Sequence, residues 1–162
     1  MKKKTYLIFT IVFLILVSGC SGYKPIFSSK NLQFKISEYS IEGNKILGNK
    51  IYSKLYRLSN KDDQNVKNID LLIKVSKDKE ATSKDSAGKI LEYKITLNTE
   101  VQVTDSITND KILNEIFISS INYKVQSQYS DTVNLENTSI ENLINKIYQN
   151  LLIEMSGSAL AK

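Results

Sequence analysis

The sequence predicts an α+β domain: a four-stranded, mostly antiparallel sheet with two helices packed on one of its faces, in the order β-α-β-β-β-α. One basis is the uninterrupted alternation of apolar and polar residues over 91–104, typical of a strand with one dry and one wet face. Another is the helical spacing of apolar residues over 43–58 and 138–157. The 162 residues suffice for one domain and are too few for two.

The first strand and the first helix are expected within residues 32–58. Apolar residues alternate along 32–41 but change phase after Ile36, which predicts a strand with a bulge or an early end. Residues 43–58 should form a helix, and Gly48 inside it indicates close packing against a strand rather than flexibility. The buried stripe of this helix consists of Leu47, Ile51, Leu55 and Leu58.

Three further strands and a second helix are expected in the rest of the chain. A strand at 69–76 leads into residues 77–87, which form either a mobile loop or a strand tip standing in water. The strand at 91–104 returns through a turn as its hairpin partner, 111–125. A polar loop is expected over 126–137, followed by a helix that starts with a capping box at Thr138–Glu141 and ends at Gly157.

The first twenty residues have the organisation of a bacterial lipoprotein signal peptide. Lys2, Lys3 and Lys4 precede an apolar run over 6–17, which as a helix is too short for the ~30 Å hydrocarbon core of a bilayer. The run ends in a lipobox made of Val17, Ser18, Gly19 and Cys20. This motif implies cleavage before Cys20, a diacylglycerol on its thiol and acylation of the new amine. Two or three acyl chains anchor a protein stably in a membrane.

The signal divides the chain into four expected parts. They are a signal peptide (1–19), a lipidated N-terminus and tether (20–31), the α+β domain (32–157) and a C-terminal tail (158–162). Ser21, rather than Asp, follows Cys20, which is typical of lipoproteins sent to the outer membrane. We therefore expect a lipid-anchored protein on the periplasmic side of the outer membrane.

Composition argues against an enzyme. The chain has no His and one Cys, which removes His-based acid–base chemistry, His metal sites and internal disulfides. The paired acids Asp62–Asp63 and Asp78…Glu80 lie in Lys-rich turns without apolar neighbours that would raise a carboxyl pKa. We expect no catalytic residue, no metal and no cofactor. Cleavage of the signal lowers the net charge from +5 to +2, so nucleic acid is not an expected partner.

Two groups of residues remain that could bind something. Lysines surround the tip of the second and third strands, and they either contact phosphates of an anionic glycolipid or only keep a loop soluble. Three isoleucines of the fourth strand should lie on a face that is otherwise solvated. Together with Tyr23 and Phe27 they could mark a partner surface. Alternatively, they contact the tether or belong to a central strand that is covered on both sides. The lysines are Lys77, Lys79, Lys84 and Lys89, with Lys94 and Lys124 further along, and the isoleucines are Ile112, Ile116 and Ile118.

Two short motifs carry a family resemblance. Residues 22–27 read Gly-Tyr-Lys-Pro-Ile-Phe and residues 91–97 read Leu-Glu-Tyr-Lys-Ile-Thr-Leu. They resemble the GFxPLY opening and the AEYxLxL strand of LptE-type lipoproteins, the lipopolysaccharide-assembly lipoproteins of alphaproteobacteria. The final helix also falls where that family has its last helix.

The resemblance implies a function without covalent chemistry. A lipoprotein of this family lies in the lumen of an LptD-like outer-membrane β-barrel, helps to assemble it and binds lipopolysaccharide. By the same resemblance Lys84 and Lys89 are the candidate lipopolysaccharide-binding residues, although their spacing to Glu92 and Tyr93 departs from the family pattern.

A second hypothesis remains open. An auxiliary lipoprotein of an ABC-type lipid transport system has a similar size and an α+β build. It would associate with inner-membrane or periplasmic components rather than with a barrel.

Overall fold

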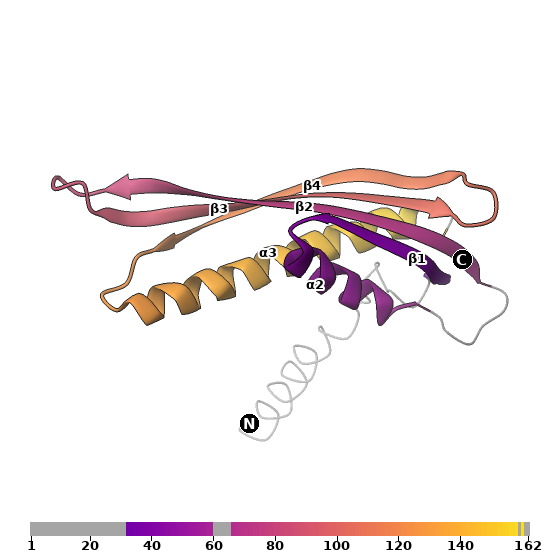
Figure 1. Ribbon diagram of the computed structural model, residues 1–162, viewed down its shortest axis with the longest axis horizontal. Coiled ribbons are helices and arrows are strands. Elements are labelled where there is room, and N and C mark those ends of the chain that lie inside the picture. Colours follow the sequence, from indigo (N-terminus) through magenta and orange to yellow (C-terminus); the bar gives the residue numbers. More distant parts are fainter. Residues whose placement is uncertain (1–31, 60–65, 159, 161–162) are drawn as a thin grey trace, which may run out of the picture.

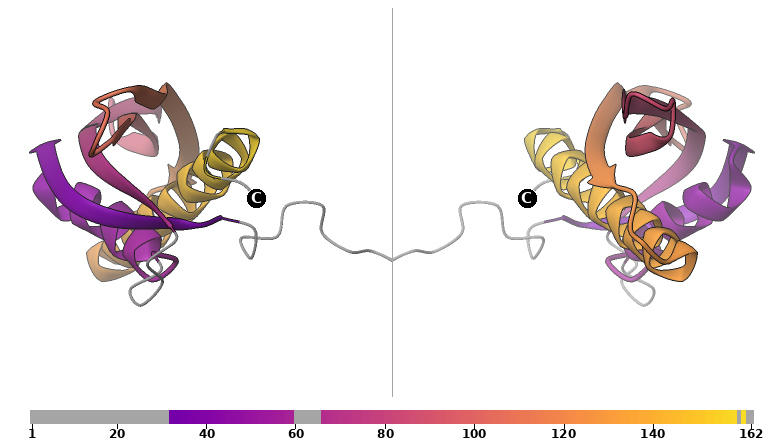
Figure 2. Two further views of the ribbon diagram at one scale, coloured as in Figure 1. Left: turned by 90° about the vertical axis from the view of Figure 1, so that its right-hand side faces the viewer. Right: turned by 90° about the vertical axis from the view of Figure 1, so that its left-hand side faces the viewer.

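The computed structural model describes residues 32–59, 66–158 and Leu160. Its elements are β1 (Phe34–Gly43), α2 (Lys45–Tyr56), β2 (Lys67–Lys84), β3 (Ile90–Asp105), β4 (Lys111–Lys124) and α3 (Tyr129–Gly157). The strands form one four-stranded sheet in the order β1-β2-β3-β4, with β1 parallel to β2 and the other neighbours antiparallel. Figures 1 and 2 show both helices on the same side of this curved sheet. The predicted fold class is confirmed.

The change of phase in the first strand corresponds to a bulge. The register between β1 and β2 shifts between Ile36 and Glu38, so that Tyr39 pairs with Leu71 and faces the helices. β1 then ends at Gly43, which has φ +72°, and a Cβ there would lie 2.3 Å from the carbonyl oxygen of Val75. Only glycine fits both the left-handed backbone and the close approach of β2.

α2 follows at once because Asn44 caps it. The Asn44 side chain accepts a hydrogen bond from the Leu47 amide at 3.1 Å, which satisfies one of the unpaired amides of the first turn. Gly48 lies against β1, where a Cβ would be 2.4 Å from Cγ2 of Ile41. The expected close packing of this glycine against a strand is therefore confirmed.

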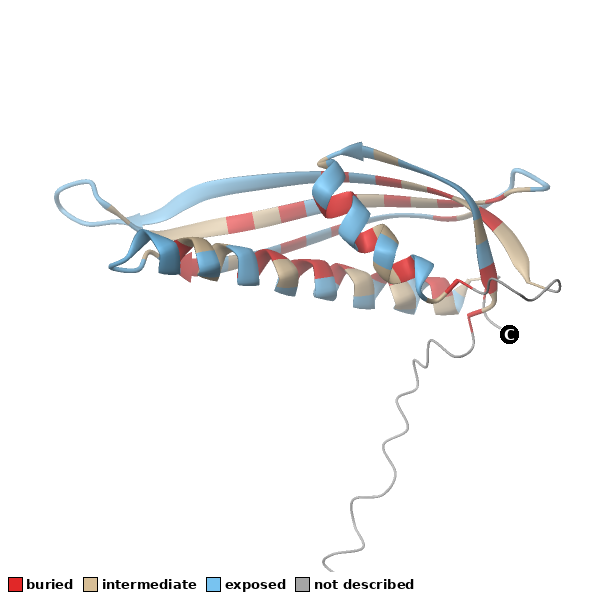
Figure 3. Ribbon diagram, turned by 60° about the horizontal axis from the view of Figure 1, so that its bottom comes forward, coloured by how far each residue is buried: buried red, intermediate tan, exposed pale blue. Residues whose placement is uncertain are grey.

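The core fills the space between the helices and the inner face of the sheet. α2 packs under β1 and β2, whereas α3 packs chiefly under β4. Figure 3 shows the buried positions of both layers facing each other. Each fully buried aliphatic side chain contributes roughly 1.5–3 kcal/mol. Those with essentially no exposed surface include Ile51, Leu55, Ile73, Ile95, Leu97, Ile144, Ile147 and Leu151.

The β2–β3 hairpin continues beyond this core. Val75 is the last buried residue of β2, and the rest of that strand, residues 76–84, is exposed. Of the two alternatives for residues 77–87, the strand tip is right as far as Lys84, and a short turn with Gly88 at φ +82° joins it to β3. In Figure 1 this hairpin projects past the other strands on the side where α3 begins.

The predicted start of the last helix is wrong. α3 begins at Tyr129, with Gln128 as its N-cap, so residues 129–137 are helical rather than a polar loop. Thr138 lies inside the helix, and its hydroxyl donates to the Asn134 carbonyl oxygen at 2.9 Å instead of forming a capping box. The first turns of α3 lack the apolar stripe because they face the polar hairpin, which hydropathy does not reveal. The predicted end at Gly157 is confirmed.

No helix in the described ranges is long and apolar enough to cross a membrane.

Gly43 gives a direct test of the β1–α2 junction. We expect Gly43→Ala to lower the free energy of unfolding by roughly 1–3 kcal/mol, because the added methyl group meets the Val75 carbonyl and the backbone is left-handed. Gly157→Ala is the matched control, since nothing lies within 4 Å of a Cβ there. Urea unfolding followed by circular dichroism measures both. Equal stability of the two variants would contradict the packing at Gly43.

Candidate anion-binding groove

A groove with a volume of ≈ 540 Å³ lies between the β2–β3 hairpin and the first turns of α3. It exists because β2 and β3 extend beyond the core while α3 begins beneath them. Its lining includes the apolar side chains of Ile90, Val125 and Val133 as well as polar ones. Its lining comes from several elements: Lys79 of β2, Lys89 of the turn, Tyr93 of β3, Gln126 after β4, and Thr132 and Glu136 of α3.

A polar cluster ties these elements together, and we call it the Glu136 cluster (Lys77, Lys79, Tyr93, Tyr123 and Glu136). Oε2 of Glu136 accepts from Nζ of Lys79 at 2.6 Å and from the hydroxyl of Tyr123 at 2.9 Å. Oε1 of Glu136 lies 3.5 Å from Nζ of Lys77. One carboxylate of α3 therefore holds two lysines of the hairpin, Lys77 and Lys79, and a tyrosine of β4.

Aromatic rings hold Lys79 from another direction. Its Nζ lies 4.3 Å from the ring centroid of Tyr93 and 5.6 Å from that of Tyr123. The two rings stack across β3 and β4 with centroids 5.8 Å apart. An ammonium group over aromatic faces gains a cation–π attraction in addition to its ion pair.

The electrostatics keep this cluster charged. Burial by itself would raise the pKa of Glu136, but the hydrogen bonds from Lys79 and Tyr123 and the nearby lysine charges hold it below its usual range. Burial would likewise lower the pKa of Lys79, and the hydrogen bond and charge of Glu136 outweigh that effect and raise it. At neutral pH the groove therefore presents ammonium groups and one carboxylate.

The structure separates the two lysines predicted to bind lipopolysaccharide. Both are exposed at the hairpin end, but Lys89 lines the groove and Lys84 is not among its lining residues. The turn is fixed by Asp85, whose Oδ1 accepts from the amides of Ala87 and Lys89 at 2.9 Å each. Of the lysines that the sequence singled out, Lys89 and Lys79 therefore line the groove.

The remaining lysines of that set have other positions. Lys94 lies on the outer face of the sheet, where its Nζ is 3.2 Å from Glu80. Lys124 ends β4 and pairs in register with Glu92. Neither lines the groove. Sequence reasoning missed Glu136, Tyr123 and Thr132, and the only available signal was a glutamate in a segment that it assigned to a loop.

Two of the three isoleucines of β4 lie on the face without helices, whereas Ile112 packs against the core. Ile116 and Ile118 are 62% and 66% exposed, and Ile112 is half-buried. Among the alternatives, a strand covered from both sides by the described residues is therefore wrong. Tyr23 and Phe27 lie outside the described residues, as do the acids Asp62 and Asp63 and the lipobox with Cys20.

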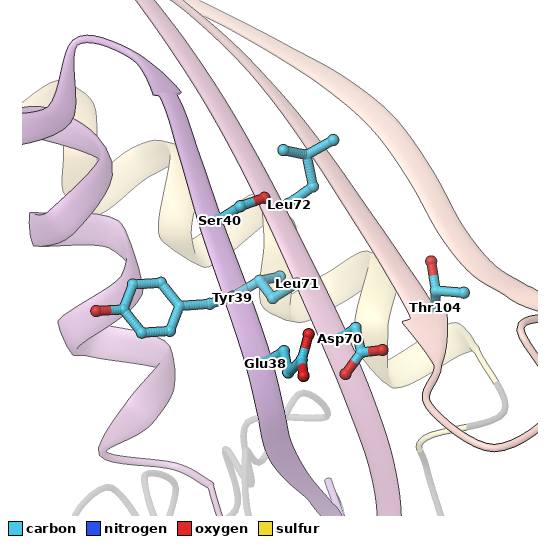
Figure 4. Close-up of a pocket in the computed structure, with 7 residues that line it drawn as sticks. All are labelled: Glu38, Tyr39, Ser40, Asp70, Leu71, Leu72 and Thr104. Carbon is cyan, nitrogen blue, oxygen red and sulfur yellow. The ribbon is translucent and has the colours of Figure 1, made fainter.

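A second, smaller pocket of ≈ 160 Å³ lies at β1 and β2. Figure 4 shows the carboxylates of Glu38 and Asp70 near each other on these strands, at paired register positions. The Ser106 hydroxyl donates to Asp70 at 2.7 Å, and no lysine lines the pocket. Two carboxylates repel an anion, so the groove at the hairpin is the better candidate. The described part of the chain contains no group of three His, Cys, Asp or Glu residues that could hold a metal ion.

A mostly antiparallel sheet with two helices on one face is an arrangement shared by small bacterial lipoproteins of known structure. A candidate lipoprotein from Caulobacter crescentus aligns with a TM-score of 0.53 and 8% identity over 75% of this chain and 88% of that one. Lipoprotein B from Nitrosomonas europaea aligns with a TM-score of 0.51 and 11% identity, over 81% of this chain and 88% of that one. A minor lipoprotein from Acinetobacter baumannii aligns with a TM-score of 0.50 and 12% identity, over 79% of this chain and 96% of that one.

These likenesses establish the fold. No family profile and no curated protein matches the sequence.

The Glu136 cluster should contribute stability that depends on pH. A carboxyl whose pKa is lowered by folding stabilises above its unfolded pKa of about 4.3, and that contribution is lost as the pH falls through the lower folded value. We expect Glu136→Gln to destabilise by roughly 1 kcal/mol at pH 7 and by progressively less below pH 4. Urea unfolding across this range measures the difference.

Glu154→Gln is the control, because Glu154 is exposed on the same helix and has no hydrogen bond or ion pair in the described part of the chain. Its effect should stay small at every pH. A constant Glu136→Gln effect from pH 7 to pH 3 would contradict the ionic role of the cluster.

Proposed function

We propose that this protein is an outer-membrane lipoprotein of the LptE type, which plugs and helps to assemble an LptD-like β-barrel that delivers lipopolysaccharide to the outer leaflet. The observation that carries the proposal is a lipobox placed directly ahead of a domain with the fold of bacterial lipoproteins. The motifs at 22–27 and 91–97 point to the LptE type among such proteins.

The shape and surface of the domain support a role without covalent chemistry. One face of the sheet is not covered by the helices, and it carries polar side chains at most positions, as a protein does that fits into a wet barrel lumen. The hairpin projects from the body of the domain and carries a groove with ammonium groups and tyrosine rings. Phosphorylated sugars fit such a lining, because lysines pair with phosphates and aromatic rings stack on sugar faces.

The anchor can be tested in cells. We expect Cys20→Ser to leave an uncleaved precursor that does not fractionate with the outer membrane, because the lipidated thiol is lost. Immunoblotting of membrane fractions measures size and location. Normal processing and outer-membrane fractionation of this variant would contradict the lipoprotein assignment.

The partner can be tested by co-purification. The tagged, detergent-extracted protein should bring down a large β-barrel whose mobility changes on heating. Recovery without any barrel would contradict the plug function, and recovery with inner-membrane transporter components would favour the auxiliary lipoprotein of an ABC-type system.

The groove makes the two predicted lysines unequal. We expect Lys89→Glu to weaken binding to lipopolysaccharide micelles about three- to tenfold, since it reverses a charge at the groove, whereas Lys84→Glu should have a smaller effect. Both effects should diminish with added salt. Fluorescence titration with labelled lipopolysaccharide measures the affinities. Equal losses, or no loss with Lys89→Glu, would contradict the groove as the site.

A further inference from the structure

We propose that Glu136 is an internal competitor for the groove, so that an anionic ligand reaches Lys77 and Lys79 only by displacing this carboxylate. The inference rests on the binding role proposed above and describes how that site is regulated. The ligand class is a phosphorylated group that offers at least two anionic oxygens.

The geometry already satisfies the lysines. Glu136 uses one oxygen for Lys79 and the other for Lys77, at 2.6 Å and 3.5 Å. These are the contacts that a phosphate group makes with a pair of ammonium groups. Glu136 and Lys79 line the groove, whereas Lys77 does not and is reached only through its contact with Glu136. A phosphate that entered would therefore meet the carboxylate before it could reach Lys77.

Displacement is feasible because the cluster remains within reach of water. The side chains of Glu136, Lys77 and Lys79 are 18%, 31% and 33% exposed. Solvent screens ion pairs at such partly exposed positions, so an entering anion can exchange with the carboxylate. Lys79 would also keep its place after the exchange, because its Nζ rests 4.3 Å from the Tyr93 ring centroid.

Lys89 gives the ligand a first contact. Its side chain is exposed at the rim of the groove, and it forms no ion pair within the described residues. A phosphorylated ligand would therefore meet this lysine first and then exchange with Glu136 for Lys77 and Lys79.

The test is the affinity of the full-length protein, purified in detergent, for inorganic tripolyphosphate measured by calorimetry. Glu136→Gln removes the competing charge, and we expect binding about three- to tenfold tighter than wild type, with a steeper loss on adding salt. Glu154→Gln, the matched control on the same helix, should leave the affinity unchanged. In the double variant Lys79→Gln/Glu136→Gln the gain should disappear.

A second variant keeps the test decisive if Glu136→Gln folds poorly. Tyr123→Phe removes one donor to Glu136 but neither charge of the pair, so the carboxylate is held less firmly. We expect about twofold tighter binding. Unchanged or weaker binding in a folded Glu136→Gln or Tyr123→Phe protein overturns the proposal, because a purely structural cluster would lose affinity when it is loosened.

A parallel arm with lipopolysaccharide micelles separates this inference from the proposed function. A gain with tripolyphosphate, but no binding of lipopolysaccharide by any variant, supports the competition and contradicts lipopolysaccharide as the ligand. Binding of lipopolysaccharide by the wild type, with no gain in Glu136→Gln for either probe, overturns the competition and leaves the proposed function standing.

Discussion

The hydrophobic core ends before the sheet does, and the rest of this structure depends on that boundary. Val75 of β2 and Ile95 of β3 are the fully buried residues nearest the hairpin tip, and the hairpin residues beyond them are exposed or half-buried. α3 nevertheless continues under this region from Tyr129 onward. The space between them holds the Glu136 cluster and a groove that is open to water, and three charged side chains, Lys79, Lys89 and Glu136, line this groove together with tyrosine and aliphatic side chains.

The polar contacts of the Glu136 cluster differ from the aliphatic packing of the core in how they can be broken. Aliphatic packing is lost only when the domain unfolds, whereas an ion pair at the surface can exchange one partner for another of the same charge. The body of the domain is therefore fixed by Ile73, Leu97 and Ile147, and backbone pairing continues the sheet into the hairpin, while the ion pairs between the hairpin and α3 are contacts that a suitable anion can replace. A rigid body with an exchangeable charged site agrees with the proposed role of handling an anionic lipid without covalent chemistry.

The sequence predicted the fold well because the core follows simple periods. Alternation along β2 and β3 and the helical stripe of α2 identify the buried residues, and even the bulge after Ile36 is visible as a change of phase. The start of α3 was missed because its first turns face polar groups, so tertiary contacts rather than hydropathy make them helical. For the same reason Glu136 and Tyr123 were not recognised, since partners far apart in sequence give no local signal. The lysines of the hairpin were found, but only the structure distinguishes Lys89, at the groove, from Lys84.

The most direct measurement of the central claim is the nuclear magnetic resonance of the lysine ammonium groups during titration with an anion. If the groove binds it, the signals of Lys79 and Lys89 should shift at low ligand concentration, while those of Lys94 and Lys124 stay in place. The internal comparison is sharp because Lys94 lies on the opposite face of the sheet, paired with Glu80. Uniform shifts of all four lysines, or shifts confined to Lys94 and Lys124, would contradict the account.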